Sequence, residues 1–274
     1  LSEMEAAAQA AAKDTGINLT TQDANSDTSK MIQYIESSVT AGEDAIIINM
    51  VDPETAAQCI EAAGDVPVVF VNRFPGDPSV LNEKAVYVGS DEMTSGAFQG
   101  EFLAKFFKDQ GKTDISYLML NGILGQTSTT NRTASVLKAL EDNGIKATAA
   151  AAPLAADYDR ATAMDMISPL LKTTKYDCII SNNDAMALGA VEAMQQQGLD
   201  PKSVPIVGID ATADGRQAIK DGTLAMTVFQ NAEGQGRASL QAAANLIDGK
   251  PIAEGTGYEV DDENEFIIWV PFEP

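Results

Sequence analysis

The feature that most constrains the fold of this 274-residue chain is a regular alternation between short apolar runs and helix-like segments. Residues 45–50 (AIIINM) are almost continuously apolar, which is typical of a strand buried on both faces of a sheet. Strands that alternate with helices of about 10–15 residues predict an α/β fold built on doubly wound parallel sheets. The expected strands are INLTTQ (17–22), AIIINM (45–50), PVVFV (67–71), ISYLML (115–120), ATAAAA (147–152), YDCIIS (176–181), PIVGID (205–210), LAMTVFQ (224–230) and EFIIWVPF (265–272).

Two helices near the start of the chain have clear end signals. Residues 2–16 predict a helix in which Ser2 is the N-cap, Glu5 completes a capping box and Gly16 ends the helix. A second helix is expected over residues 28–41. About ten strands are many for one open sheet, and a length of 274 residues fits two domains. We therefore expect two doubly wound domains.

The composition excludes several function classes. The chain has 40 Asp and Glu against 18 Lys and Arg, a net charge of −22, so a nucleic-acid partner is disfavoured. It contains no His, which excludes Ser-His-Asp catalysis and His-ligated zinc. Cys59 and Cys178 are far apart and form no CxxC motif. No apolar run reaches the ~18 residues of a membrane span, and because the sequence opens inside a helix we expect any secretion signal to have been removed.

The polar residues that follow the expected strands are mostly amides and hydroxyls. They are Asn72, Arg73, Gln126, Ser128, Arg132, Tyr158, Asn182, Asn183, Asp184, Asp210, Gln230 and Asn231. Ligands of doubly wound sheets bind beyond the carboxyl ends of the strands, and sugar hydroxyls need partners that both donate and accept. A sugar-binding site is therefore one interpretation. Helix capping is the alternative for Asn182 and Asp184.

Several segments resemble a known family. TSKMIQYIESSVTAGEDAIIINMVDPETAAQCIEAA, VPVVFVNRFP, VYVGSDEMTSGAFQGEFLAK, NNDAMALGAVEAM and PIVGIDA are similar to type I periplasmic solute-binding proteins of bacterial ABC sugar importers. The galactose/glucose-binding branch is the most similar, with the ribose binders nearby. The resemblance implies two lobes, joined by three hinge strands, that close on one sugar. The first lobe is expected at 1–90 plus 231–268 and the second at 91–230 plus 269–274.

The resemblance also implies roles for individual residues. Asn72 matches a sugar-contacting Asn of the first lobe, and Arg132 matches an Arg on the ring-oxygen side of the sugar. Asn183 and Asp210 match two further hydroxyl ligands, and Gln230 matches an amide at the hinge. The complete predicted set of ligand-binding residues is Asn72, Arg73, Gln126, Ser128, Arg132, Tyr158, Asn183, Asp210 and Gln230.

Three of these positions depart from the galactose/glucose branch. Gln126 stands where that branch has His, Ser128 where it has Asp, and Tyr158 where it has the Trp that stacks on the sugar. All three changes keep hydrogen-bonding character but leave the particular sugar open. The calcium loop of that branch corresponds to residues 109–114, which lack the alternating oxygen ligands, so we expect no bound metal.

The ends of the chain also depart from the family pattern. The family begins with a central strand of the first sheet, and its following loop supplies an acidic and an aromatic sugar ligand. Both would precede Leu1. Relatives also continue beyond the position of Pro274. We therefore expect that the chain is trimmed or that this strand is supplied from elsewhere.

The leading interpretation is a non-enzymatic, extracytoplasmic carrier that captures a monosaccharide, most simply galactose or glucose, and delivers it to an ABC permease. No cofactor and no nucleic acid are expected, and the carrier is expected to be a monomer. The main alternative is the sugar-sensing domain of a LacI-type transcription repressor, which needs a helix-turn-helix before Leu1. A sugar-processing enzyme is a third interpretation, because Asp157, Asp159, Asp184 and Asp210 all fall near strand ends.

Overall fold

The computed structural model describes all 274 residues, and the chain divides into two compact units. Unit 1 comprises Leu1–Ser90 and Asn231–Pro271, and unit 2 comprises Asp91–Gln230 and Phe272–Pro274. The chain therefore passes three times from one unit to the other. The sequence placed residues 269–271 in the second lobe. They lie in unit 1, because Ile267–Trp269 forms a strand that pairs within the sheet of that unit.

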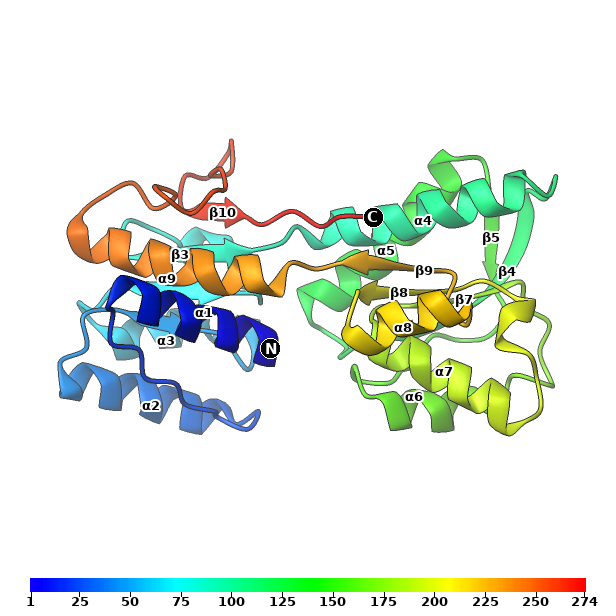
Figure 1. Cartoon of the computed structure of the whole chain (residues 1–274), viewed down its shortest axis with the longest axis horizontal. Coiled ribbons are helices and arrows are strands. Elements are labelled where there is room, and N and C mark those ends of the chain that lie inside the picture. The colour runs from blue at the N-terminus through cyan, green and yellow to red at the C-terminus, as the bar shows by residue number, and fades with distance from the viewer. The chain divides into compact units, whose positions relative to one another are not determined.

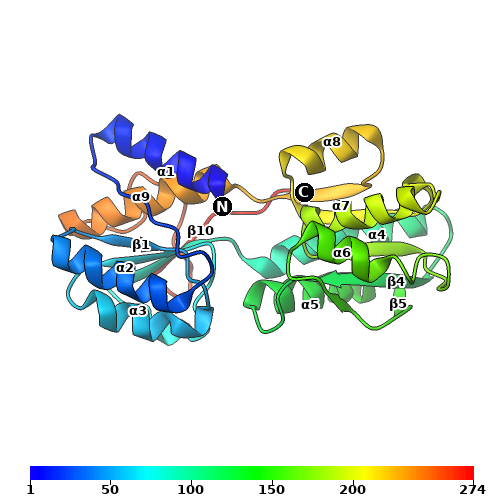
Figure 2. The same cartoon turned by 90° about the horizontal axis from the view of Figure 1, so that it is seen from below.

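Unit 1 is a parallel sheet covered by helices on both faces. Its strand order is β1-β2-β3-β10, with bounds β1 Ile46–Ile48, β2 Val68–Val71, β3 Ala85–Gly89 and β10 Ile267–Trp269. Helices α1 (Ser2–Thr15) and α9 (Ala232–Asp248) lie together on one side, and α2 (Thr28–Ala41) and α3 (Ala56–Ala63) lie on the other (Figure 2). Two short 3-10 helices, η1 (Pro53–Thr55) and η2 (Pro78–Val80), complete this unit.

Alternate residues of the unit 1 strands face opposite layers. Val69 of β2 packs in a cluster with Ala238 of α9, whereas Val68 and Phe70 pack with Met31 of α2. This alternation follows from the two-residue period of a strand. Because both faces are covered, every residue of β2 is buried, which explains its continuous apolar sequence.

Unit 2 is a second parallel sheet with helices on both faces (Figure 1). Its strand order is β5-β4-β7-β8-β9, and β6 pairs with the end of β4. The strands are β4 Asp114–Asn121, β5 Lys146–Ala149, β6 Leu154–Ala155, β7 Cys178–Ser181, β8 Ile206–Asp210 and β9 Met226–Phe229. The helices are α4 Glu92–Lys108, α5 Thr127–Asp142, α6 Arg160–Ile167, α7 Asp184–Gln196, the 3-10 helix η3 Pro201–Ser203, and α8 Ala213–Asp221.

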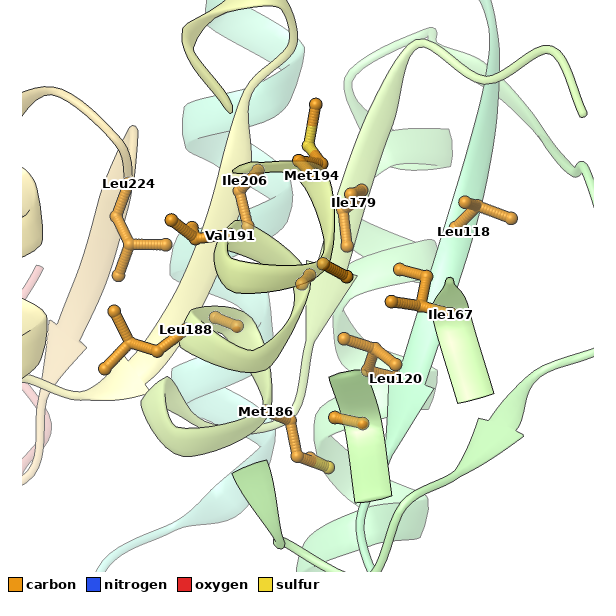
Figure 3. Packing of buried hydrophobic residues seen from close by; sticks show 14 of the residues in the cluster. Leu118, Leu120, Ile167, Ile179, Met186, Leu188, Val191, Met194, Ile206 and Leu224 are labelled. Carbon is orange, nitrogen blue, oxygen red and sulfur yellow. The ribbon is translucent and has the colours of Figure 1, made fainter. Parts of the chain in front are cut away.

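One core layer of unit 2 joins α7 to the sheet. Leu188 and Val191 of α7 share a buried cluster with Ile179 of β7 and Ile206 of β8 (Figure 3). Ile167 of α6 belongs to the same cluster. Full burial of a side chain of this size contributes roughly 1.5–3 kcal/mol, so this layer holds α7 against β7 and β8. No helix in the chain is both long and apolar enough to cross a membrane.

Two local predictions were wrong, and one strand was not predicted. Ser2 is the first residue of α1 and not its cap; Leu1 is at the N-cap, and no side chain caps this helix. Residues 17–22 form no strand, because backbone N–H and C=O groups form a strand only when an adjacent strand pairs with them, and none does. The segment Ala85–Gly89 was not predicted, yet it forms β3 because β2 and β10 pair with it on both sides.

Candidate functional site

The candidate site in unit 2 lies at the carboxyl edge of its sheet. Strands β4, β7, β8 and β9 are parallel neighbours, so their carboxyl ends share one edge. Seven of the nine predicted ligand-binding residues end or follow these strands or β6: Gln126, Ser128, Arg132, Tyr158, Asn183, Asp210 and Gln230. The remaining two, Asn72 and Arg73, follow β2 in unit 1.

Arg132 is the central charged group of this edge. Its side chain is 6% exposed; Nε donates to Glu92 Oε2 at 2.6 Å and Nη2 donates to Glu92 Oε1 at 3.1 Å. Nη1 donates to the carbonyl of Asn182 at 2.7 Å and lies 3.7 Å from Oδ1 of Asp210. The ring of Phe272 lies 5.8 Å from the guanidinium carbon. Three of the five guanidinium N–H donors are thus in hydrogen bonds within the protein, and two remain available.

The charges at this edge shift one another's pKa values. Burial alone lowers the pKa of Arg132, but Glu92 and Asp210 more than offset this effect, so its pKa is raised and the group stays charged. Burial raises the pKa of Asp210 to about 7; Arg132 opposes this rise, and Asp184 and Glu92 add to it. Asp210 therefore has the capacity to donate as well as accept a hydrogen bond near neutral pH.

Hydrogen bonds of its hydroxyl group and packing of its ring against the backbone of Gly122 fix the position of Tyr158. The hydroxyl lies 2.8 Å from Ser128 Oγ and 2.9 Å from Thr129 Oγ1, both at the start of α5. A Cβ at Gly122 would overlap the ring, so the ring rests directly on the glycine backbone. The structure thus brings two of the predicted ligand-binding residues, Tyr158 and Ser128, into contact, and the side chain of Tyr158 is half-buried. Whether the ring stacks on a sugar stays a prediction.

Three amide side chains at this edge have unused donors. Oδ1 of Asn183 accepts from the backbone N–H of Met186 at 3.0 Å and so caps α7, while its Nδ2 makes no hydrogen bond. Nε2 of Gln230 is shielded from solvent and has no partner. Gln126 is at the N-cap of α5 without a side-chain hydrogen bond to the helix. Capping therefore uses one side of Asn183 and leaves an N–H group for a ligand.

In unit 1, Asn72 and Arg73 differ in how they are held. Asn72 adopts a left-handed backbone with φ 66°, and its carbonyl accepts a hydrogen bond from the Tyr87 hydroxyl at 2.9 Å. Nη1 of Arg73 donates to the carbonyls of Met50 and Val51 at 2.7 and 2.9 Å. Arg73 therefore stabilises the segment that follows β1 through hydrogen bonds to its backbone. The sequence did not indicate this structural role.

Unusual backbone geometry coincides with three of the predicted residues. Seven residues other than glycine have a positive φ, and they include Asn72 (66°), Tyr158 (63°) and Asp210 (113°). Such conformations cost about 1–3 kcal/mol each and persist where the surrounding structure holds them, often at binding sites. Because these angles are independent of the sequence pattern, they add a separate indication that the strand ends form a functional site.

Two buried carboxylates were not among the predicted site residues. Glu92 is the first residue of α4 after its cap Asp91, a position whose sequence signal is only a favourable interaction with the helix dipole. Asp184 was considered as a helix cap, but Asn183 caps α7. Asp184 instead binds Thr212 and Thr227. The only sequence signal for Glu92 or Asp184 as a site residue is that each is an acidic residue close to the end of a strand.

No group of three or more His, Cys, Asp or Glu side chains in the chain is arranged to hold a metal ion. The groups at the carboxyl edge of unit 2 are hydrogen-bond donors and acceptors, together with one cation, Arg132, whose charge is paired with Glu92. The predicted absence of a metal stays a prediction.

Comparison with known proteins decides the family. Residues 1–251 match the family described as a periplasmic binding protein domain. The chain belongs to this family. It is 35% identical to the D-galactose/methyl-galactoside binding periplasmic protein MglB of Haemophilus influenzae, over 94% of this chain and 79% of that protein. It is 33% identical to a putative rhizopine-binding protein of Rhizobium meliloti, again over 94% and 79% of the two chains.

The structural comparison agrees with this family. A crystal structure of an ABC transporter solute binding protein from Bacillus halodurans, with bound myo-inositol, superposes with a TM-score of 0.80. The two chains are 28% identical, and the match covers 99% of this chain and 88% of the other. These three relatives are binding proteins by name. The predicted α/β fold with doubly wound parallel sheets is confirmed.

Proposed function

We propose that this protein is the extracytoplasmic sugar-binding component of an ABC importer, which binds a neutral monosaccharide or cyclitol and delivers it to the membrane subunits of a permease. Family membership supports the transport role. The residues at the carboxyl edge of the unit 2 sheet support the ligand class. Closure of two lobes on the sugar and a monomeric state remain predictions.

The observation that carries the ligand class is the set of unused hydrogen-bond donors. Arg132 keeps two N–H groups, Asn183 keeps its Nδ2, and Gln230 has a shielded Nε2 without a partner. A shielded donor without a partner costs about 1–3 kcal/mol, so these groups favour a ligand that accepts several hydrogen bonds. Asp210 adds a group that accepts them. Adjacent hydroxyls of a sugar or a cyclitol supply both functions.

The names of relatives narrow the candidates. MglB is named for D-galactose and methyl-galactoside, and the Bacillus halodurans protein holds myo-inositol. We infer that galactose or glucose is the first candidate and that an inositol is the second, since all are uncharged rings bearing several hydroxyls. Gln126, Ser128 and Tyr158 replace the residues that the galactose/glucose branch uses, and we assign the choice among these ligands to them.

A thermal-shift screen followed by calorimetry tests this proposal. The screen uses D-galactose, D-glucose, D-ribose, D-allose and myo-inositol, and a ligand of the folded state raises the melting temperature. The variant Asn183→Ser keeps a side chain that caps α7 but removes the amide donor. The matched control is Asn143→Ser. It changes an amide at the C-terminal end of α5, whereas the predicted site residues of α5 lie near its N-terminal end.

We expect at least one neutral ligand to bind, Asn183→Ser to weaken its binding by about tenfold or more, and Asn143→Ser to leave it unchanged. Absence of binding to all five ligands contradicts the proposed function. Equal binding by the Asn183→Ser variant contradicts the assigned site alone. Recovery of the bound sugar unchanged distinguishes a carrier from an enzyme. No observation favours the repressor alternative.

A further inference from the structure

Glu92 is placed to control the charge that the candidate site presents to a ligand. It forms a bidentate ion pair with Arg132, and the side chains of the two residues are 8% and 6% exposed. Both partners lie on the helices that cover one face of the unit 2 sheet, and their residues are 40 positions apart in the chain. A bidentate pair fixes the plane of a guanidinium as well as its position.

Close packing of α4 against α5 makes this pair possible. Asp91 caps α4 through the backbone N–H of Met93, so Glu92 begins the first turn of the helix. Gly96 follows one turn later, and a Cβ there would overlap Ser135 Oγ and the carbonyl of Arg132. The absence of a side chain at Gly96 therefore lets the two helices approach closely enough for Glu92 to reach Arg132.

The pair also decides which donors of Arg132 remain. Glu92 takes Nε and one N–H of Nη2, and the carbonyl of Asn182 takes one N–H of Nη1. One N–H on each terminal nitrogen is left for a ligand. Since those two donors belong to a cation already paired with one carboxylate and lying 3.7 Å from a second, Asp210, the site offers directional hydrogen bonds with little net positive charge.

We propose that Glu92 is a specificity-determining residue: by orienting Arg132 and neutralising it, Glu92 makes the site accept uncharged polyols and reject sugar acids. This inference rests on the proposed sugar-binding function. A ligand carboxylate brought to this edge meets a guanidinium that is already paired with the negative charge of Glu92 and that lies 3.7 Å from the carboxyl group of Asp210. Such a ligand loses its hydration without gaining an unpaired cation in exchange.

The inference predicts a change of ligand class when only the charge of Glu92 is removed. Glu92→Gln keeps the shape of the side chain and one oxygen that accepts from Arg132, but it leaves the guanidinium without its principal counterion. A uronate carboxylate then becomes a suitable partner for Arg132. Glu92→Asp keeps the charge but shortens the side chain, so it separates orientation from neutralisation.

Calorimetry at neutral pH with two matched ligand pairs tests this. The pairs are D-galactose with D-galacturonate and D-glucose with D-glucuronate; the members of each pair differ by a carboxylate in place of a hydroxymethyl group. We expect the unaltered protein to prefer the neutral member, and Glu92→Gln to shift the ratio of affinities toward the uronate by about tenfold or more. Glu92→Asp should weaken the neutral ligand and keep the preference against uronate.

Glu101→Gln is the matched control, because Glu101 is an exposed residue of the same helix, and it should leave the ratio unchanged. A preference of the unaltered protein for uronate, or an unchanged ratio in a folded Glu92→Gln variant, overturns the inference while leaving sugar binding intact. If Glu92→Gln does not fold, loss of discrimination in Glu92→Asp overturns it. Failure of the unaltered protein to bind any neutral polyol overturns the proposed function and this inference together.

Discussion

Replacing Asp184 by Ala removes a buried carboxylate that joins three elements of unit 2. Asp184 is fully buried in the first turn of α7. Its Oδ2 accepts from the backbone N–H of Thr212 at 2.8 Å and from the Thr212 hydroxyl at 3.2 Å, and its Oδ1 accepts from the Thr227 hydroxyl at 2.6 Å. Thr212 caps α8 and Thr227 lies in β9, so one side chain links α7, α8 and the sheet.

The size of the effect follows from which groups lose a partner. A hydrogen bond to a charged group contributes about 1.5–3 kcal/mol, and a donor left buried without a partner costs about 1–3 kcal/mol. Because these contributions overlap, we expect Asp184→Ala to lower the free energy of unfolding of unit 2 by about 3–5 kcal/mol. In Asp184→Asn, the amide oxygen still accepts from Thr212 and the amide nitrogen donates to the Thr227 hydroxyl oxygen, so we expect a loss of only about 1 kcal/mol.

Urea denaturation with two signals is the measurement. Far-UV circular dichroism reports the helices of both units, whereas fluorescence reports unit 1, because the single tryptophan of the chain, Trp269, lies there. The expected order of unfolding midpoints by circular dichroism is Asp184→Ala lowest, then Asp184→Asn, then the unaltered protein. Asp142→Ala, which removes an exposed ion pair with Lys138, is the control and should change stability by less than about 1 kcal/mol.

The pH dependence gives a further check on the same site. Burial raises the pKa of Asp184 above its ordinary value of 3.8, although hydrogen bonds from Thr227 and Thr212 oppose the rise. The ionised carboxylate therefore costs stability as pH rises from that value through the raised pKa of the folded state. The deficit of Asp184→Asn should shrink over this range. Equal destabilisation by Ala and Asn, or no loss in the Ala variant, would refute the reasoning.

Three further predictions concern packing, thiols and charge. Gly100→Ala should lower the free energy of unfolding by about 1–3 kcal/mol in thermal denaturation, because its Cβ would lie 2.6 Å from Ala139 Cβ; a more stable variant contradicts this. Burial raises the pKa of the Cys59 and Cys178 thiols to about 11 and about 12, so a thiol reagent should label them only after unfolding, and rapid labelling of the native protein counts against their burial. The pKa of Asp210 is raised to about 7, so the stability of Asp210→Asn relative to the unaltered protein should increase from about pH 4 to 7, and a constant difference contradicts the shift.

Much of the fold was predictable because its signals are local. The apolar run 67–71 became β2, and residues 28–41 became α2 with Asp27 as its cap. Burial on both faces of a parallel sheet requires a continuous apolar sequence, so such strands can be predicted from their own residues, without knowledge of the strands that pair with them. The prediction of strands failed at the segments where pairing with a neighbouring strand determines whether a strand forms. Residues 17–22 have β-rich composition but no paired strand, and Ala85–Gly89 is a strand because two others flank it.

The candidate site divides in the same way. The sequence by itself determined which residues follow the strands, and therefore that Arg132, Asn183 and Asp210 lie at one edge of one sheet. Only the tertiary structure decided their state: the pairing of Arg132 with Glu92 and the linking of Asp184 to Thr227. Strand ends are set by the local hydrophobic pattern, whereas a buried ion pair depends on how closely two helices approach, which residues 40 positions apart cannot show in sequence.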